Sequence, residues 1–369
     1  MSESSRPAVH LRVPGSRRHV FFFRKMVKRP EVPIEPGSVV DVFDRYGAPL
    51  GCGFYNPHSE IALRMLGPSE EGLIERRVRE AVAFRDSLGI EGDAWRVCHS
   101  EGDGLSGLVV DRYGPVHSIE LFSLGMHRQV PLLRGLFPNA WVRADERVQE
   151  LEGFRIPLEK PPDPVVVQEH GVKFRVDFAT GHKTGFFCDQ RENRREVARL
   201  AKGRTLLDLC CYTGGFGVAA AHGGASRVLG IDMDEEALDT AQANARLNGV
   251  KVEFRHVNVF DHLRGSTEAW DVVVLDPPKM ARDKGDLAKA QRGYFDMNRL
   301  AARAVKPGGV LVTCSCTGLV GEEEFLGIVR EASERELRIF RVAGAGPDHP
   351  VSSWYPEGRY LKVVYARVV

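Results

Sequence analysis

The sequence predicts an α/β protein whose C-terminal half is built on a mostly parallel seven-stranded sheet, with two smaller regions before it. Two observations lead to this prediction. From about residue 180 onward, short apolar runs alternate strictly with stretches of helical length, whereas the chain before residue 68 reads as short strands separated by turn residues. Continuous apolar strands separated by helices are typical of a parallel sheet that is covered on both faces.

The two regions before the sheet are predicted to be separate domains. Residues 8–69 contain the strand-like runs AVHLRV, SVVDVFDRYG, PLGCGFYNP and IALRML, which turn residues interrupt, and this pattern predicts a small β-barrel-like domain. Residues 70–178 are predicted to form a central α+β domain. It begins with an expected helix over 69–89, in which acidic residues come early and basic residues late. A Pro-rich segment over 159–167 is expected to form a rigid, extended connection.

Residues 179–369 are predicted to form the domain that contains the parallel sheet. The expected parallel strands are 205–210, 227–232, 252–257, 271–276 and 309–315, and the expected helices are 215–223, 234–249, 286–305 and 321–336. The last two apolar runs are expected to close the sheet as an antiparallel hairpin. Ligands of such sheets bind beyond the carboxyl ends of the strands. Asp208, Asp232, Asp276 and Cys316 all fall at those ends.

The stretch LLDLCCYTGGFGVAAA (206–221) is a strand, a Gly-rich loop and a helix, and it predicts a cofactor site. It contains neither the GxGxxG pattern of dinucleotide-binding loops nor the GK[ST] of phosphate loops. It does place Asp208 six residues before Gly214. An acid beside a close-approach glycine loop suits the ammonium and sulfonium of S-adenosyl-L-methionine better than it suits a pyrophosphate, because opposite charges attract.

Other residues are candidates for the same cofactor site. Asp232 could accept hydrogen bonds from the ribose hydroxyls, Asn258 could accept from the adenine amine, and Tyr212 lies in the loop itself. Each acid alone could equally be a helix cap or a solvated loop end. The ordered set Asp208, Gly214 and Asp232 favours a methyl-donor site over a nicotinamide site.

The loop GHKTGFFCDQRENR (181–194) precedes the first strand and could cover the methyl donor, with Gln190 and Arg191 pointing inward. The alternative is an ordinary helix N-terminus, against which Phe186 and Phe187 pack.

The stretch VVVLDPPKM predicts the substrate side of the site. Asp276, Pro277, Pro278 and Lys279 follow the fourth strand, and two prolines fix the backbone there. A rigid loop that exposes carbonyl groups and one carboxylate can accept hydrogen bonds from the edge of a nucleobase held in a pocket. The alternative is a simple turn after a buried strand.

The stretch TCSCTG contains Cys314 and Cys316 and raises several possibilities. Two cysteines give only two zinc ligands, and a disulfide between them would be strained, so neither a metal site nor a disulfide is expected. Cys314 is expected to pack in the core. Cys316 could add as a thiolate to C6 of a cytosine, so that C5 becomes nucleophilic enough to attack a methyl group. Asp276 would hold N3 and N4 of the base, and either Asp276 or a water would remove the C5 proton. Lys279 could lower the thiol pKa or could be a solvated surface lysine.

The motifs GHKTGFFCDQR, LLDLCCYTGGFG, LDPPK and TCSCTGL resemble, in this order, those of bacterial 23S rRNA (cytosine-C5) methyltransferases with an N-terminal PUA domain. The similarity extends to SEGDGLSGLVVDRYG (100–114) and HPVSSWYPEGRYLK (349–362). The resemblance implies a Rossmann-like class I methyltransferase domain, a PUA RNA-binding barrel, S-adenosyl-L-methionine as cofactor and Cys316 as nucleophile. It also places Asn258 where the family commonly has an acid.

The resemblance implies an rRNA substrate, and one part of the chain has a suitable charge pattern. Eight Lys and Arg residues and no acid lie between Arg6 and Arg29, although the net charge of the whole chain is only +1. Interleaved with Phe21–Phe23, these cations could bind phosphates and stack bases; the alternative is a solvated face with the Phe residues as core. The candidate RNA contacts are Arg17, Arg18, Arg24, Lys25 and, in the second half of the chain, Lys183, Pro277, Pro278 and Lys279.

Composition bounds where the protein works. Its seven cysteines show no CxxC pair, and no run approaches the roughly 18 apolar residues that a membrane span needs, so a reducing cytoplasm is expected. A homodimer is left open. The alternatives to a cytosine-C5 methyltransferase are an N-methyltransferase that uses the DPPK loop without a thiol, a non-catalytic RNA-binding or ribosome-assembly factor, and a small-molecule methyltransferase.

Overall fold

The structure is a computed structural model that describes residues 6–179 and 186–369, and the chain divides into two compact units. Unit 1 comprises Met1–Ile90, Trp95–Pro162 and Pro347–Gly358, and unit 2 comprises Glu91–Ala94, Asp163–Gly346 and Arg359–Val369. A segment close to the C-terminus therefore belongs to the unit built from the N-terminal part of the chain. The predicted boundaries of three domains stay a prediction.

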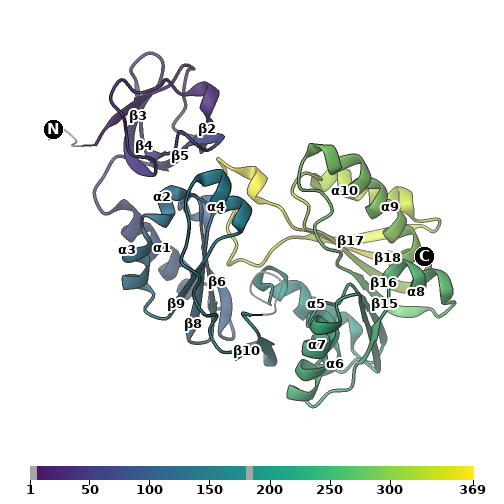
Figure 1. Ribbon diagram of the computed structural model, residues 1–369. Coiled ribbons are helices and arrows are strands. Elements are labelled where there is room, and N and C mark those ends of the chain that lie inside the picture. Colours follow the sequence, from purple (N-terminus) through teal and green to yellow (C-terminus); the bar gives the residue numbers. More distant parts are fainter. Residues whose placement is uncertain (1–5, 180–185) are drawn as a thin grey trace. The chain divides into compact units, whose positions relative to one another are not determined.

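Unit 1 contains two sheets (Figure 1). The five-stranded sheet has the order β1-β3-β4-β5-β2, with bounds Ala8–His10, Ser38–Phe43, Pro49–Tyr55, Ile61–Gly67 and Phe21–Phe23. It encloses its own apolar core, in which Leu11, Phe22 and Leu63 are fully buried. The four-stranded sheet has the order β6-β7-β8-β9, with bounds Ala94–His99, Leu108–Tyr113, Val116–Leu121 and Ala140–Arg143. Helices α1, α2, α3 and α4 accompany it, with bounds Leu73–Ser87, Leu124–His127, Val130–Leu136 and Glu146–Glu152.

Unit 2 is built on a seven-stranded sheet with the order β14-β13-β12-β15-β16-β18-β17 (Figure 1). Strands β12 to β16 run parallel, with bounds Thr205–Leu209, Arg227–Asp232, Glu253–His256, Trp270–Leu275 and Val305–Ser315. Strand β18 (Lys362–Val368) lies antiparallel between β16 and β17 (Leu337–Ala343). The hairpin β10–β11 (Val165–Glu169 and Val172–Val176) precedes the sheet.

Alternate residues of the strands point to opposite faces of the large sheet. Both faces are buried under apolar side chains. Leu206 and Val272 pack in one apolar cluster, and their neighbours Leu207 and Val273 pack in another. The helices of unit 2 are α5 to α10, with bounds Arg191–Ala201, Gly215–His222, Glu235–Leu247, Val259–Gly265, Leu287–Arg303 and Glu322–Ala332. In the parts of the chain that are described, no helix is long and apolar enough to cross a membrane.

The predicted α/β fold class is confirmed, including the antiparallel closure of the sheet. Each of the five expected parallel strands and the four expected helices of residues 179–369 lies within a few residues of its predicted bounds. The hairpin β10–β11 and helices α4 and α8 were not predicted. The two helices have only seven residues each, which is too short for a clear helical period.

Candidate active site

A strained loop joins β12 to α6. Cys210 and Tyr212 adopt left-handed conformations with φ of 60° and 48°, and Gly214 has a φ of 77°. Such conformations cost a non-glycine residue about 1–3 kcal/mol and persist only where the surroundings impose them. Here the Tyr212 N–H donates to the carboxylate of Asp232 at 2.7 Å. A Cβ atom on Gly214 would lie 3.0 Å from the Cβ of Ala241, so a glycine fits this position best.

Asp208 lies near the end of β12 and is fully buried. Its Oδ2 accepts the N–H of Gly217 at 2.8 Å, and its Oδ1 has no hydrogen-bond partner among the residues that the structure describes. Burial raises the pKa of Asp208 to about 8, and the carboxylates of Asp276 and Asp232 add to this effect. A buried acceptor without a partner is costly, so Oδ1 suits a site that receives a donor from a ligand.

Two further residues of the predicted cofactor site lie at neighbouring strand ends. The carboxylate of Asp232, at the end of β13, accepts the N–H groups of Tyr212 and Met233 at 2.7 Å each and of Asp234 at 3.0 Å. Asn258 follows β14 and caps α8, because its side-chain oxygen accepts an N–H of the first turn at 2.8 Å. Asp232 is thereby held in place beside the loop, and the amide nitrogen of Asn258 donates to Sδ of Met233 at 3.1 Å.

Asp276 follows the end of β15 and stands in a small polar cluster. Its carboxylate accepts a hydrogen bond from Nε2 of Gln190 at 3.1 Å and another from the thiol of Cys314. The Nδ2 of Asn193 donates to the amide oxygen of Gln190 at 2.7 Å, which turns the amide nitrogen of Gln190 toward Asp276. Burial raises the pKa of Asp276 to about 7, and the nearby carboxylate of Asp189 adds to the shift. A carboxyl group with that pKa can both accept and donate a proton near neutral pH.

The two cysteines at the end of β16 have different surroundings. Cys314 is fully buried in an apolar cluster, and burial raises the pKa of its thiol well above the usual value. Cys316 follows the strand and is half-buried, and its Sγ lies 3.9 Å from the carbonyl oxygen of Pro277. The hydroxyl of the next residue, Thr317, lies 2.8 Å from the hydroxyl of Tyr294. The fold therefore brings Cys316 beside the loop that begins at Asp276.

Comparisons with known proteins assign this arrangement to a family. The family model of S-adenosylmethionine-dependent methyltransferases matches residues 143–350, and a PUA-like domain model matches residues 16–68. The chain is 39% identical to ribosomal RNA large subunit methyltransferase I of Aeromonas hydrophila, over 95% of this chain and 96% of that protein. This chain belongs to the same family. The corresponding protein of Photobacterium profundum is also 39% identical, over 94% of each chain.

Solved structures agree with the methyltransferase fold. A putative methyltransferase in complex with SAH superposes with a TM-score of 0.80 at 20% identity, over 98% of this chain and 99% of that chain. A putative SAM-dependent methyltransferase from Streptococcus mutans gives a TM-score of 0.79 at 19% identity, over 98% of this chain and 100% of that chain. Together with the family model, these likenesses confirm S-adenosyl-L-methionine as the cofactor of this methyltransferase family member.

The residues beyond β12 and β13 fit that cofactor. Among the described residues, Oδ1 of Asp208 has no hydrogen-bond partner and can accept a bond from a ligand. The absence of a side chain at Gly214 leaves a gap beside it. The carboxylate of Asp232, held in place at the adjoining strand end, is a second acceptor. The ring of Phe187 lies 5.4 Å from that of Tyr212, so an aromatic side chain also covers the loop. The individual roles of Asp208, Tyr212, Gly214, Asp232 and Asn258 toward the cofactor stay predictions.

The structure places three predicted residues away from these strand ends or outside its description. The guanidinium of Arg191 donates to the carbonyl groups of Ala94 at 2.8 Å and Glu91 at 2.9 Å, so it supports the chain and not the cofactor loop. Gln190 contacts Asp276 instead of the cofactor loop. Lys183 lies outside the described residues. In the described ranges there is no group of three or more His, Cys, Asp or Glu residues that could hold a metal ion.

The predicted RNA contacts are mostly exposed. Pro278 and Lys279 are exposed, whereas Pro277 is buried. Arg17, Arg18, Arg24 and Lys25 are all exposed in unit 1, and Arg24 forms an ion pair with Glu60. Of the three Phe residues between them, Phe22 is core and Phe23 is 44% exposed. The basic segment therefore combines a solvated face with one core side chain.

Two residues of the site escaped the sequence reasoning. Asn244 of α7 is fully buried, and its Nδ2 donates to the carbonyl of Thr213 in the cofactor loop at 2.9 Å. Lys362 is a buried lysine at the start of β18. An Asn on a helix face gives no sequence signal of its own. A lysine inside the apolar run YLKVVYARV is a signal that could have pointed to Lys362.

Proposed function

We propose that this protein transfers a methyl group from S-adenosyl-L-methionine to C5 of a cytosine in large-subunit ribosomal RNA, through a covalent adduct with Cys316. The relatives named above are ribosomal RNA large subunit methyltransferases, which supports the RNA class. The observation that carries the chemistry is the place of Cys316. Its half-buried thiol follows β16 beside the Asp276–Lys279 loop, at the sheet edge where ligands of such folds bind.

The proposed reaction has three balanced steps. The Cys316 thiolate adds to C6 of the cytosine, and the electron pair of the C5–C6 double bond moves so that C5 becomes nucleophilic. C5 then forms a bond to the methyl group as the bond between that methyl and the cofactor's sulfonium breaks. Finally the C5 proton leaves to a base, the C5–C6 double bond reforms, and the electron pair of the C6–S bond returns to Cys316.

Asp276 can bind the base and exchange protons with it during these steps. Its carboxyl group has a pKa of about 7, so it can donate to N3 of the base as negative charge develops there and can accept from the exocyclic amine. Gln190 holds its orientation. Asp276 and a water molecule are both candidates for the base that removes the C5 proton.

The exposed cations of unit 1 support RNA as the macromolecular substrate. Arg17, Arg18 and Lys25 lie in the range that the PUA-like model matches, and their guanidinium and ammonium groups can neutralise phosphates. We therefore assign residues 16–68 to the positioning of RNA and the strand ends of unit 2 to the methyl transfer.

The test of this proposal is the capture of the adduct with large-subunit RNA that contains 5-fluorocytosine. Because the C5 fluorine cannot leave as a proton does, the last step stops and the Cys316–C6 bond persists on a denaturing gel. The wild-type enzyme is expected to give this complex. Cys316→Ala is expected to give none and to lose methyl transfer by roughly three orders of magnitude or more, because its nucleophile is missing.

Cys314→Ala is the comparison variant, because it removes the other thiol of this strand end, which is fully buried in the apolar cluster and contacts the carboxylate of Asp276. It should retain adduct formation. Full activity of Cys316→Ala would contradict the thiol mechanism and favour an N-methyltransferase that uses the DPPK loop alone. An adduct that requires Cys314 and not Cys316 would show that the two cysteines have the opposite roles.

A further inference from the structure

Lys362 is a buried lysine in the immediate neighbourhood of Cys316. It is 2% exposed, and it is the first residue of β18, where it lies opposite Ser315 in the antiparallel register of β16 and β18. Lysines are almost never fully buried unless another group compensates their charge. The position of Lys362 therefore requires a physical explanation.

Among the residues that the structure describes, the ammonium group of Lys362 has polar contacts but no ion pair with a carboxylate. Its Nζ donates to the carbonyl groups of Thr317 and Tyr360 at 2.8 Å each. An ammonium has three N–H donors, and the third has no acceptor among the residues that the structure describes. Thr317 directly follows Cys316, so the charge stands next to the backbone that presents the thiol.

The ionisable groups that face Lys362 come from three elements. Burial lowers the pKa of Lys362, and of the groups that raise this pKa Cys316 acts most strongly, followed by Glu324 and Glu322 at the start of α10. Both acids have other partners, since Glu324 accepts the N–H of Gly321 at 3.1 Å and Glu322 pairs with Arg359 at 3.0 Å. Tyr294 of α9 places its hydroxyl 2.8 Å from the hydroxyl of Thr317, the residue whose carbonyl Lys362 binds. The thiolate of Cys316 is thus the natural counter-charge.

Resting on the proposed role of Cys316 as nucleophile, we propose that Lys362 is a positioning residue that stabilises the Cys316 thiolate. Its ammonium fixes the turn at Thr317 and supplies the positive charge that the thiolate needs. An opposite charge nearby favours the charged form of each partner. The same charge favours the return of the electron pair to sulfur when the C6–S bond breaks.

This assignment gives Lys362 the role for which Lys279 was a candidate in the sequence. Lys279 is exposed on the DPPK loop, where solvent screens its charge. Burial lowers the pKa of Lys362 to about 8, so the group is still mostly protonated at pH 7. A buried cation acts on its neighbour more strongly than an exposed cation does.

The test is the pH dependence with which iodoacetamide alkylates Cys316 in the full chain, followed by mass spectrometry of the peptide that contains it. In the wild-type enzyme the midpoint should lie below the value of about 8.5 that free cysteine shows. Lys362→Met should raise the midpoint by at least about one pH unit, which lowers the thiolate fraction at pH 7 about tenfold. Lys362→Arg keeps the charge and should stay near the wild-type midpoint. The midpoint is measured in place of the alkylation rate at one pH, because a more basic thiolate is also intrinsically more nucleophilic and the rate would mix the two effects.

Lys306→Met is the matched control. Lys306 lies at the other end of β16, where its Nζ pairs with Asp271 at 3.0 Å, and its loss should leave the Cys316 midpoint unchanged. A wild-type midpoint at or above that of free cysteine would overturn the proposal whether or not any variant folds. A folded Lys362→Met enzyme with the wild-type midpoint would overturn it as well.

The alkylation experiment needs no RNA, so it separates this proposal from the proposed function. If the midpoint shifts as expected but the fluorocytosine adduct never forms, the methyl-transfer mechanism is wrong and the pairing of Lys362 with the thiolate stands. If the adduct forms and the midpoint does not shift, only the role of Lys362 is wrong.

Discussion

Asp208 and Asp276 carry protons at a pH at which most carboxyl groups have lost theirs. Burial raises the pKa of Asp208 to about 8 and that of Asp276 to about 7. The two residues lie at the ends of adjacent parallel strands, so the carboxylate of Asp276 disfavours the ionisation of Asp208. A methyl donor with two positive groups is a ligand that could reverse this preference, because it brings the missing counter-charge.

The protonation of Asp208 leads to a prediction about stability. In the unfolded chain Asp208 has lost its proton above about pH 4, whereas the folded cofactor-free protein keeps it up to about pH 8. The free energy of unfolding should therefore fall as pH rises through this window, by about 1.4 kcal/mol per pH unit from this group alone. Asp208→Asn lacks this titratable carboxyl group. The difference in free energy of unfolding between wild type and variant should therefore change by about 1.4 kcal/mol per pH unit.

Urea unfolding of both proteins at pH 5.5, 6.5 and 7.5, without cofactor, measures this difference. Asp276 is present in both proteins, and at pH 5.5 and 6.5, below its pKa of about 7, it is mostly protonated, so the slope between these two points reports on Asp208. Parallel stability curves for wild type and Asp208→Asn over this range would mean that Asp208 is ionised in the folded protein.

At the level of elements, α7 and the hairpin β10–β11 hold the cofactor loop from outside the sheet. Asn244 uses both ends of its amide, since Nδ2 donates to Thr213 and Oδ1 accepts the N–H of Arg175 in β11 at 2.7 Å. One turn later, Asn248 binds the backbone of Lys173 in the same hairpin. The loop conformation therefore depends on an element that contributes no residue to the predicted site.

Asn244→Ala is expected to weaken cofactor binding without removing any predicted cofactor contact. It leaves the carbonyl of Thr213 and the N–H of Arg175 buried without partners, which costs about 1–3 kcal/mol per group. Part of that cost should appear as a roughly tenfold loss of affinity in calorimetry with S-adenosylhomocysteine, because about 1.4 kcal/mol corresponds to a factor of ten.

Asn248→Ala is the control on the same helix. It removes the two hydrogen bonds between Asn248 and the backbone of Lys173 but leaves both bonds of Asn244 intact. Equal losses of affinity in the two variants would show that the hairpin as a whole, and not the bond to Thr213, holds the loop.

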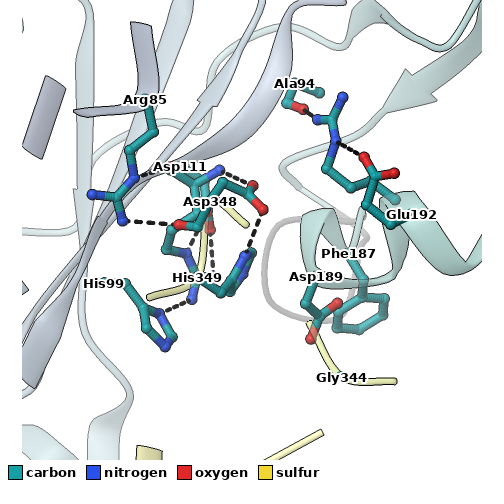
Figure 2. A network of polar contacts seen from close by, with 12 residues as sticks. Arg85, Ala94, His99, Asp111, Phe187, Asp189, Glu192, Gly344, Asp348 and His349 are labelled. Carbon is teal, nitrogen blue, oxygen red and sulfur yellow. Dashed lines mark hydrogen bonds and ion pairs between the residues drawn. The ribbon is translucent and has the colours of Figure 1, made fainter. Parts of the chain in front are cut away.

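At the level of the whole molecule, the segment Pro347–Gly358 belongs to unit 1 although it lies close to the C-terminus in the sequence. Asp348 is fully buried and accepts the N–H of Arg96 at 2.9 Å, and its own carbonyl accepts Nη2 of Arg85 at 2.8 Å (Figure 2). The ring of His349 stacks edge-on against His99 at 5.0 Å. Burial and the nearby Arg96 lower the pKa of His99 to about 2, so this ring is neutral at physiological pH.

Asp348→Ala is expected to release this segment. The backbone N–H of Arg96 and the Nδ1 of His349 lose their acceptor, whereas the backbone carbonyl that binds Arg85 remains. We expect the free energy of unfolding to fall by about 3 kcal/mol, because each buried polar group left without a partner costs about 1–3 kcal/mol. Chemical denaturation measures the change, and limited proteolysis should cut within 347–358 more readily.

Glu357→Ala serves as the control, because Glu357 is exposed on the same segment and its side chain forms no hydrogen bond or ion pair with the residues that the structure describes. It should leave both readouts unchanged. An Asp348→Ala protein as stable and as protease-resistant as the wild type would mean that apolar packing alone holds the segment.

Much of the fold and part of the candidate site could be predicted from the sequence for physical reasons. The period of apolar residues reports the burial of both faces of a parallel sheet, so strands β12 to β16 were placed within a few residues. Parallel strands end at one edge, so Asp208, Asp232, Asp276 and Cys316 could be assigned to a common region. The difference between Cys314 and Cys316 follows from the point at which β16 ends.

The sequence by itself therefore determined the α/β class, the strand ends and the family motifs, because these depend on local pattern. Only the tertiary structure decided the partners. Gln190 contacts Asp276, Arg191 binds backbone carbonyls, and Lys362 stands near Cys316 although 46 residues separate them in the chain. The last of these partnerships depends on the position of β18 between β16 and β17, and on the register that sets Lys362 opposite Ser315. No periodicity along the chain encodes such long-range contacts.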